Sequence, residues 1–349
     1  METPPASSSL AASRGEYYGR IEHEHMAPLW TRLKSLVPTG PSVVGQPHRW
    51  RYADVRPYVF EAGELITAAE AERRVLILEN PAFRGKSRIT NSLYAGLQLL
   101  LPGEVAPAHR HTQSALRLVL EGGGAYTAVN GEKTIMREGD FVITPAWTWH
   151  HHGNDGDTPV VWLDGLDIPT VAFFNSTFRE DHPDGAEAEV VRPTGDALAR
   201  YGSGLLPVGH RPGSLNSPVF NYPYERTREA LRTLARAGGP DPRHGYLMRF
   251  ANPADGGWAM PTIATMIRLL PSGFSTLPYR SSDACVFVAL EGTGAITIGQ
   301  TRLSFGPRDV ITVPGWLAYT LEASSDAVLF SFSDRVVQEK LGFFRESTG

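Results

Sequence analysis

Cysteine is almost absent from this sequence: Cys285 is the single cysteine among 349 residues. One thiol excludes an intrachain disulfide framework and a cysteine-based zinc finger. Any metal ion must therefore take its ligands from the 11 histidines and the carboxylates. Cys285 itself lies in the apolar run DACVFVALEG, which is typical of a small buried side chain.

Long apolar runs and concentrated charge are missing as well. No stretch of about 18 apolar residues is present to span a membrane, and the N-terminus lacks the basic flank and apolar core of a secretory signal. We therefore expect a cytoplasmic location. The formal charge of −4 contains no block of one sign, which argues against nucleic acid or an anionic membrane as the main partner and favours a small molecule.

The N-terminal part, residues 1–72, is expected to form an arm followed by helices. Residues 1–14 are rich in proline, serine and alanine, so we expect a mobile arm with order beginning after it. Apolar residues recur at roughly helical spacing over residues 15–38, which predicts helices. His23 and His25 point to different faces of such a helix, so we do not expect them to bind one ion.

Residues 73–185 and 256–349 have the pattern of an all-β barrel or sandwich, with short apolar runs interrupted by Gly, Pro and Asn about every ten residues. Asn130-Gly131 stands between two alternating runs and predicts a tight hairpin, because both central positions of that turn need a positive φ. Residues 186–255 are rich in proline and glycine and contain the helical stretch 224–237. We interpret them as a connector.

The second β region repeats the first. HRHTQSALRLVLEGGG, residues 109–124, aligns without gaps on YRSSDACVFVALEGTG, residues 279–294, at an offset of 170. DFVITPAWTWH, residues 140–150, aligns on DVITVPGWLAY, residues 309–319, at an offset of 169. Two matches at nearly one offset indicate a duplicated β domain.

Three histidines of the first β region are candidate metal ligands. Alternate side chains of a strand share a face, so His109 and His111 should project together into a barrel. His150 belongs to a stretch that the repeat assigns to the same barrel, and neutral imidazoles bind Fe, Zn, Cu or Ni. The alternative is that all three are ordinary core or surface histidines, which is the commoner meaning of an isolated His-x-His pair.

The second copy provides an internal control for this choice. Gly122 and Pro145 recur there as Gly292 and Pro314, as expected of residues that build the fold. The three histidines do not recur, since their positions hold Tyr279, Ser281 and Tyr319. The histidines are therefore not needed by the fold, which favours a metal site in the first barrel and no metal ligands in the second.

Two stretches resemble the cupin motifs. GEVAPAHRHTQSALRLVLEG is similar to the first motif, and it has Ala115 where many cupins have Glu. GDFVITPAWTWHHHGN is similar to the second, and it has Trp147 in a glycine position. The matching positions are Gly103, His109, His111 and Gly122 in the first motif and Gly139, Pro145, His150 and Asn154 in the second. The resemblance implies a bicupin, an all-β dominated fold of two double-stranded β-helix (jelly-roll) barrels with N-terminal and connector helices.

The segments LYAGLQLLLPGEVAPAHRHTQSALR, TPAWTWHHHGN and WLDGLDIP resemble the gentisate 1,2-dioxygenase family, which includes salicylate and hydroxynaphthoate dioxygenases. The likeness extends over most of the chain. It implies one Fe(II) per subunit in the N-terminal barrel, bound by three histidines without a carboxylate. It also implies cleavage of a 2-hydroxybenzoate by O2 between the carboxyl-bearing and hydroxyl-bearing ring carbons, and a homotetramer.

Several polar residues could serve that chemistry. Arg117 lies an even number of residues after His111, so a regular strand through both would bring its guanidinium to the same face, where it could bind a substrate carboxylate. The alternative is an exterior arginine. His152 shares parity with His150 and could act as an acid or base, whereas His151 points elsewhere by the same parity.

The family resemblance adds further pocket residues. Gln98 and Asp164 match positions around the ring, and Asp164 could accept a hydrogen bond from a hydroxyl para to the ring hydroxyl, although it could equally cap the turn before Gly165. The remaining candidates for the pocket wall are Trp162, Tyr94 and one of Arg73 and Arg74, of which we choose Arg73.

Two departures from the family pattern bear on the substrate. Tyr94 stands where many relatives have Trp, and His151 stands where Asp is expected. The resemblance therefore implies gentisate or another substituted salicylate as the substrate, such as a 5-nitro, 5-amino or 5-halogeno acid, or a hydroxynaphthoate. Outside this class, the alternatives are a metal-dependent bicupin isomerase or decarboxylase and a storage or ligand-binding bicupin.

Overall fold

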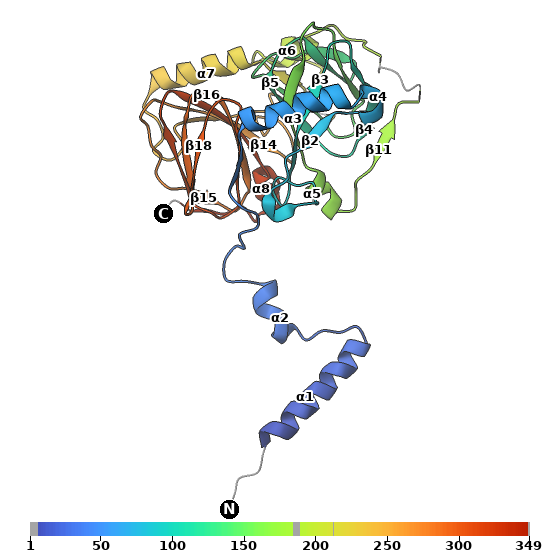
Figure 1. Cartoon of the computed structure of the whole chain (residues 1–349), viewed down its shortest axis with the longest axis vertical. Coiled ribbons are helices and arrows are strands. Elements are labelled where there is room, and N and C mark those ends of the chain that lie inside the picture. Colours follow the sequence, from blue (N-terminus) through green and yellow to red (C-terminus); the bar gives the residue numbers. More distant parts are fainter. Residues whose placement is uncertain (1–5, 184–188, 212, 348–349) are drawn as a thin grey trace, which may run out of the picture. The chain divides into compact units, whose positions relative to one another are not determined.

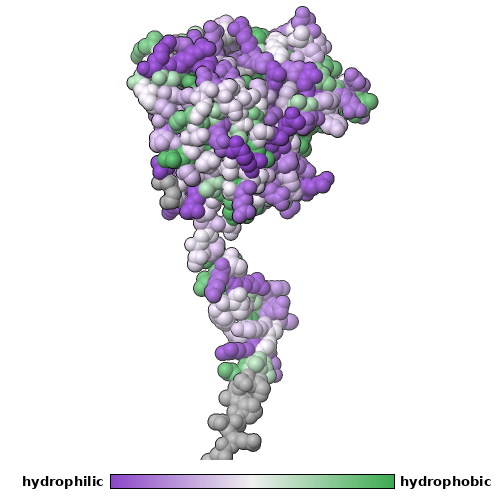
Figure 2. Space-filling model, turned by 60° about the vertical axis from the view of Figure 1, so that its left-hand side comes forward, coloured by the Kyte–Doolittle hydropathy of each residue, from purple (hydrophilic) through white to green (hydrophobic). Residues whose placement is uncertain are grey.

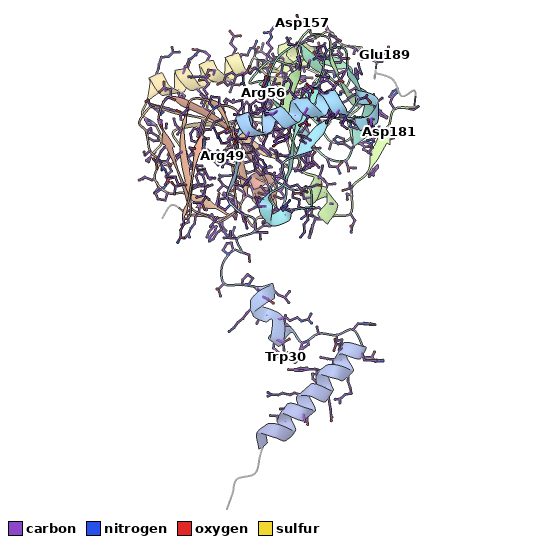
Figure 3. All side chains as sticks on the ribbon, viewed as in Figure 1. Trp30, Arg49, Arg56, Asp157, Asp181 and Glu189 are labelled. Atoms are coloured by element: carbon purple, nitrogen blue, oxygen red, sulfur yellow. The ribbon has the colours of Figure 1, made fainter. Side chains whose placement is uncertain are left out.

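The computed structural model describes residues 6–183, 189–211 and 213–347, and the chain divides into two compact units, Met1–Ser42 and Val43–Gly349. The smaller unit contains helices α1 (Ala6–His23) and α2 (Leu29–Leu36), in which the Trp30 indole N–H donates to the Tyr18 hydroxyl at 3.0 Å (Figures 1 and 3). Helix α1 begins at Ala6, so regular structure starts before residue 15, where the sequence placed its beginning. Residues 1–5 lie outside the described part.

The larger unit contains two β-barrels and several short helices (Figure 1). Its helices are α3 (Tyr52–Leu65), α4 (Ala68–Ala71), η1 (Pro81–Phe83), α5 (Ile168–Phe173), α6 (Asp196–Tyr201), α7 (Tyr224–Ala237) and α8 (Arg335–Leu341). Helix α7 begins and ends where the sequence predicted it. Among the described residues, no helix is long and apolar enough to cross a bilayer.

Two antiparallel sheets form the first barrel. One has the strand order β12-β8-β5-β10-β3-β2, and the other has the order β11-β4-β9-β6-β7. The strands are β2 (Val75–Ile77), β3 (Tyr94–Leu100), β4 (Val105–His111), β5 (Ala115–Glu121), β6 (Ala125–Val129), β7 (Glu132–Ile135), β8 (Phe141–Thr144), β9 (His150–Asn154), β10 (Val160–Leu166), β11 (Arg179–Asp181) and β12 (Asn221–Tyr222). The predicted hairpin joins β6 to β7, with φ of 48° at Asn130 and 79° at Gly131.

The second barrel repeats this arrangement. Its sheets have the orders β1-β19-β16-β21-β14-β13 and β18-β17-β20, and β15 pairs separately with β22. The strands are β1 (His48–Trp50), β13 (Tyr246–Arg249), β14 (Ala264–Leu270), β15 (Arg280–Ser281), β16 (Cys285–Glu291), β17 (Gly294–Ile298), β18 (Thr301–Phe305), β19 (Val310–Val313), β20 (Tyr319–Ala323), β21 (Ala327–Ser333) and β22 (Glu346–Ser347). The predicted duplication and the predominantly β fold are confirmed.

A buried aspartate marks the same place in both copies. Asp167 follows β10 and accepts a hydrogen bond from the Ser114 amide at 3.0 Å. Asp334 follows β21 and accepts one from the Ala284 amide at 3.1 Å. Each carboxylate thus joins the end of one strand to the residue before β5 or β16, so the repeat extends to polar contacts as well as to strands.

The larger sheets of the two barrels pack against each other through aromatic side chains. Phe141 of β8 lies 5.4 Å from Phe330 of β21 and 4.6 Å from Phe250, measured between ring centroids, and all three are buried. The segment before the first barrel also contacts both. Strand β1 pairs with β19 of the second barrel, while Arg56 on α3 forms an ion pair with Glu121 of β5 at 2.5 Å (Figure 3). In the view of Figure 2 the exposed face of this unit is mainly hydrophilic, with scattered apolar side chains.

Candidate metal centre

The smaller sheet of the first barrel brings three imidazoles together. His109 and His111 lie on β4, and His150 lies on β9, where it is the register partner of His109. The ring centroid of His150 is 4.1 Å from that of His109 and 4.9 Å from that of His111. One ligand atom from each ring lies within 4.8 Å of the others, so the three could hold one metal ion.

Backbone carbonyls orient two of these rings. His111 Nδ1 lies 2.8 Å from the Gln113 carbonyl oxygen, and His150 Nδ1 lies 2.8 Å from that of Thr148. A carbonyl only accepts, so each Nδ1 carries the proton and leaves a lone pair on Nε2. His150 Nε2 is buried and has no hydrogen-bond partner within the described part of the chain, which is what a ligand atom aimed at a metal position requires.

The environment keeps these histidines neutral. Burial, followed by the charge of Arg73, lowers the pKa of His109 to about 2. Burial also lowers the pKa of His111 to about 4 and that of His150 well below its ordinary value. Because a metal binds the unprotonated imidazole, such a cluster is ready for a cation at neutral pH without losing protons first.

The facing sheet contributes an arginine and a carboxylate. Arg117 on β5 and Asp164 on β10 are register partners, and Arg117 Nε lies 3.4 Å from Asp164 Oδ1. The Trp162 indole N–H donates to the same oxygen at 3.0 Å. The predicted geometry for Arg117 is wrong in one respect: β4 ends at His111, so the two residues belong to different sheets rather than to one strand face.

His152 is fully engaged by its neighbours. Its Nε2 accepts a hydrogen bond from Arg117 Nη2 at 2.8 Å, so the neutral ring carries its proton on Nδ1, which lies 2.9 Å from the Thr127 hydroxyl oxygen. Burial and then Arg117 keep the pKa of His152 well below its ordinary value. His151 points away from this site and its ring lies edge-on to Tyr126 at 5.7 Å.

The remaining sequence candidates lie on and beside β3. Gln98 is 1% exposed, pairs in register with Trp162, and its amide nitrogen has no hydrogen-bond partner among the described residues. Tyr94 is half-buried at the start of β3, and burial raises its pKa. Arg73 Nη2 lies 2.5 Å from His109 Nδ1, whereas Arg74 forms a buried ion pair with Glu104 at 2.6 Å. Of the two arginines, Arg73 is therefore beside the imidazole cluster.

The site has an excess of positive charge. Arg73 and Arg117 face it. Among the described residues, Asp164 is the one acid that forms an ion pair with either arginine. Burial raises the pKa of Asp164 to about 6, although Arg117 and the Trp162 N–H act in the opposite direction. Burial and the nearby arginines lower the pKa of Arg73 to about 10. Such a pocket suits an anionic ligand.

Two threonines were missed by the sequence reasoning. Thr127 lies against His152, and the Thr144 hydroxyl accepts a hydrogen bond from Arg117 Nη1 at 2.5 Å. The repeat held a signal for Thr144, because the equivalent position of the second copy is Val313. A hydroxyl that is present in one copy only indicates a hydrogen bond that only this copy makes, here the one to Arg117.

Known proteins match this chain over nearly its whole length. Residues 96–166 match the Cupin domain family. Gentisate 1,2 dioxygenase 1 of Aquipseudomonas alcaligenes is 54% identical, covering 97% of both chains, and 5-aminosalicylate 1,2-dioxygenase of a Comamonas species is 36% identical, covering 92% of this chain and 87% of that protein. A crystal structure of a salicylate 1,2-dioxygenase mutant from Pseudoaminobacter salicylatoxidans in complex with gentisate is 33% identical, covers 99% of this chain and 97% of that one, and has a TM-score of 0.90.

Proposed function

The chain belongs to the gentisate 1,2-dioxygenase family of ring-cleaving dioxygenases, and we propose that it cleaves gentisate between the carboxyl-bearing and hydroxyl-bearing ring carbons and incorporates both atoms of O2 into the product. The proposal rests on what the two sheets of the first barrel bring to its interior. Three neutral imidazoles on one sheet face an arginine and a buried carboxylate on the other. This arrangement provides for a metal and an aromatic acid together.

We assign Fe(II) to His109, His111 and His150. Three neutral nitrogen donors fit a divalent transition metal, and within residues 6–183, 189–211 and 213–347 no carboxylate joins the cluster, which leaves other positions open. When bound, a ferrous ion at such a site supplies coordination positions and electron density for the reaction of the ring with O2.

The chain's own residues bind and orient the acid. Arg117 and Arg73 are positioned to hold its carboxylate, because the Arg73 guanidinium contacts His109 of the cluster and that of Arg117 contacts the neighbouring His152. Asp164 would accept the hydrogen bond of a hydroxyl para to the ring hydroxyl, which gentisate has and salicylate lacks. Trp162 and Tyr94 would form the walls beside the ring, and the Gln98 amide, which has no partner among the described residues, can donate to an oxygen in the pocket.

His152 is not free to act as an acid or base, because both of its ring nitrogens have hydrogen-bond contacts. Both of its nitrogens lie within hydrogen-bond distance of Arg117 or Thr127, so in this state it orients the guanidinium. It can move a proton at Nε2 only when Arg117 turns toward a substrate carboxylate and releases that nitrogen. We therefore assign to His152 a positioning role first and a proton-transfer role coupled to substrate binding.

A panel of acids tests the substrate assignment. The iron-loaded enzyme would be offered gentisate, salicylate, 5-aminosalicylate, 5-nitrosalicylate and 1-hydroxy-2-naphthoate, with kcat/KM measured for each in the wild type and in Asp164→Asn. We expect gentisate to be the best substrate, and Asp164→Asn to lose more activity with gentisate than with salicylate. A wild type that prefers a 5-nitro or 5-amino acid, or an equal loss with both acids, would favour the rival substrates.

Two further properties are proposed with the function. A homotetramer follows from the resemblance to other bicupins, and light scattering of the purified protein measures it directly. A cytoplasmic location stays a prediction, and cell fractionation tests it.

A further inference from the structure

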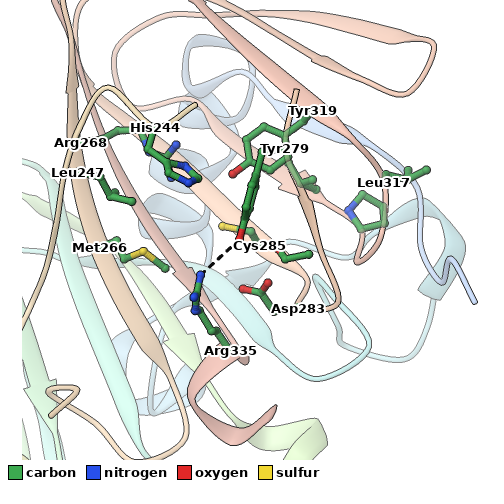
Figure 4. Close-up of a pocket in the computed structure, with 13 residues that line it drawn as sticks. His244, Leu247, Met266, Arg268, Tyr279, Asp283, Cys285, Leu317, Tyr319 and Arg335 are labelled. Atoms are coloured by element: carbon green, nitrogen blue, oxygen red, sulfur yellow. Dashed lines mark hydrogen bonds between the residues drawn. The ribbon is translucent and has the colours of Figure 1, made fainter. Parts of the chain in front are cut away.

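The second barrel contains a cavity, lined by polar and apolar side chains, at the place that corresponds to the metal centre of the first. It has a volume of about 50 Å³, and its lining includes Tyr279, Ser281 and Tyr319, the equivalents of the three histidines (Figure 4). Figure 4 also shows His244 and Arg268 near one end of the cavity, and Asp283 and Arg335 near the other. The cavity is thus a second pocket of the chain, separate from the site described above.

Arg268 gives this cavity its chemistry. It is 2% exposed, and its Nε and Nη1 are buried without a hydrogen-bond partner among the described residues. In the first barrel the equivalent position, at the same place on β3, holds the neutral Gln98. A buried guanidinium with unused donors costs several kcal/mol unless an anion compensates it.

The second barrel has no acid at the position equivalent to Asp164 that could neutralise the Arg268 guanidinium. Ser331 stands on β21 where the first barrel has Asp164 on β10, and the buried Ser331 hydroxyl lies against the Cys285 thiol. Phe287 replaces Arg117 in the same way, and its ring lies under the Arg268 guanidinium at 4.9 Å. The arginine of the second barrel therefore stands on a different strand from Arg117, and no equivalent of Asp164 accompanies it.

The other ionisable groups do not supply a counter-ion to Arg268. Arg335 forms ion pairs with Glu339 at 2.7 Å and with Glu346 at 3.8 Å, and the Tyr279 hydroxyl donates to Glu346 at 2.6 Å. Asp283 is the one carboxylate lining the cavity, and His244 is neutral, since burial lowers its pKa to about 4. Because Arg335 already has acidic partners, Arg268 is the lining arginine without an ion pair among the described residues.

We propose that this cavity binds a small carboxylate anion, the size of formate or acetate, with its oxygens on Arg268. A cavity of about 50 Å³ is roughly a third of the ~150 Å³ cavity that holds benzene in another protein, so an aromatic acid is too large. Leu247 and Met266 line the same cavity and suit a short apolar tail. A guanidinium matches the two oxygens of a carboxylate in a bidentate pair.

Calorimetric titration of the iron-loaded protein with sodium formate and sodium acetate tests the proposal, with sodium chloride at equal concentration as the control. We expect one saturable site per chain and a saturable rise in Tm. Arg268→Gln, which restores the residue of the first barrel, should weaken binding at least about tenfold, because it removes a charge-assisted pair. Arg302→Gln, on the exposed face of the same barrel, should bind as the wild type does.

A second variant guards against a folding defect in the first. Ser331→Asp supplies the missing internal carboxylate and should also abolish anion binding, while oxygen uptake with the aromatic substrate continues. Binding that persists unchanged in both variants would belong to the first barrel and would overturn the proposal. So would an equal effect of chloride, or the absence of saturable binding in the wild type. None of these outcomes depends on which aromatic acid the first barrel cleaves.

Discussion

The replacement Asp164→Asn gives a quantitative test of the electrostatics of the first barrel. Burial raises the pKa of Asp164 to about 6, whereas the carboxyl of an unfolded chain has a pKa of 3.8. Between these values the folded protein keeps a proton that the unfolded chain has lost, so the free energy of unfolding falls as the pH rises. Asn cannot ionise, and the variant therefore lacks this fall.

The change in the free energy of unfolding follows from the difference between the two pKa values of Asp164, about 6 in the folded protein and 3.8 in the unfolded chain. One pH unit corresponds to about 1.4 kcal/mol, so the variant should gain about 2 kcal/mol relative to the wild type between pH 4.5 and pH 7.5. Urea unfolding of both metal-free proteins, followed by tryptophan fluorescence, measures the difference at each pH, and groups that titrate alike in both proteins cancel. The same variant should lose about a hundredfold in kcat/KM with gentisate if Asp164 takes part in proton transfer.

One result would refute the electrostatic reasoning. A stability difference that shrinks as the pH rises would mean that the attraction of Arg117 outweighs the burial of the carboxylate, and that the pair stabilises the fold. In that case Asp164 would be a structural partner of Arg117, and a loss of activity in the variant would reflect a displaced guanidinium.

Three further substitutions have distinct expected outcomes. His111→Ala should lose bound iron by metal analysis, whereas Tyr279→Ala, at the equivalent place in the second barrel, should keep it; iron retained in His111→Ala would contradict the ligand assignment. Thr144→Val should raise KM about tenfold in steady-state kinetics, because a hydrogen bond to the buried guanidinium is lost; an unchanged KM would contradict it. Arg73→Gln should raise KM with little change in Tm, whereas Arg74→Gln should lower Tm by leaving Glu104 unpaired, and the reverse pattern would exchange the roles of the two arginines.

Features that depend on local periodicity were predictable from the sequence. Strand alternation brought His109 and His111 to one face, and the Asn130-Gly131 turn followed from the φ values it needs. The repeat identified the barrel to which His150 belongs. These signals work because each one relates residues that lie on one strand or at a fixed offset.

Features that depend on where a strand ends or on distant pairing were not predictable. The even spacing from His111 to Arg117 did not reveal that the chain turns between them and crosses to the other sheet. Strand β1 is three residues long and pairs with residues more than 250 positions away, which no local pattern can indicate. The contact of Arg117 with Thr144 likewise arises from two strands meeting across a sheet.

Oxygen consumption by the iron-loaded protein with gentisate tests the central claim most directly. An oxygen electrode and the absorbance of the ring-opened product would be followed together, before and after removal of the metal with a chelator. We predict one O2 consumed for each product molecule formed, no consumption in the metal-free protein, and recovery on addition of Fe(II). Product formed without oxygen uptake would contradict the dioxygenase assignment, and so would full activity in the metal-free protein.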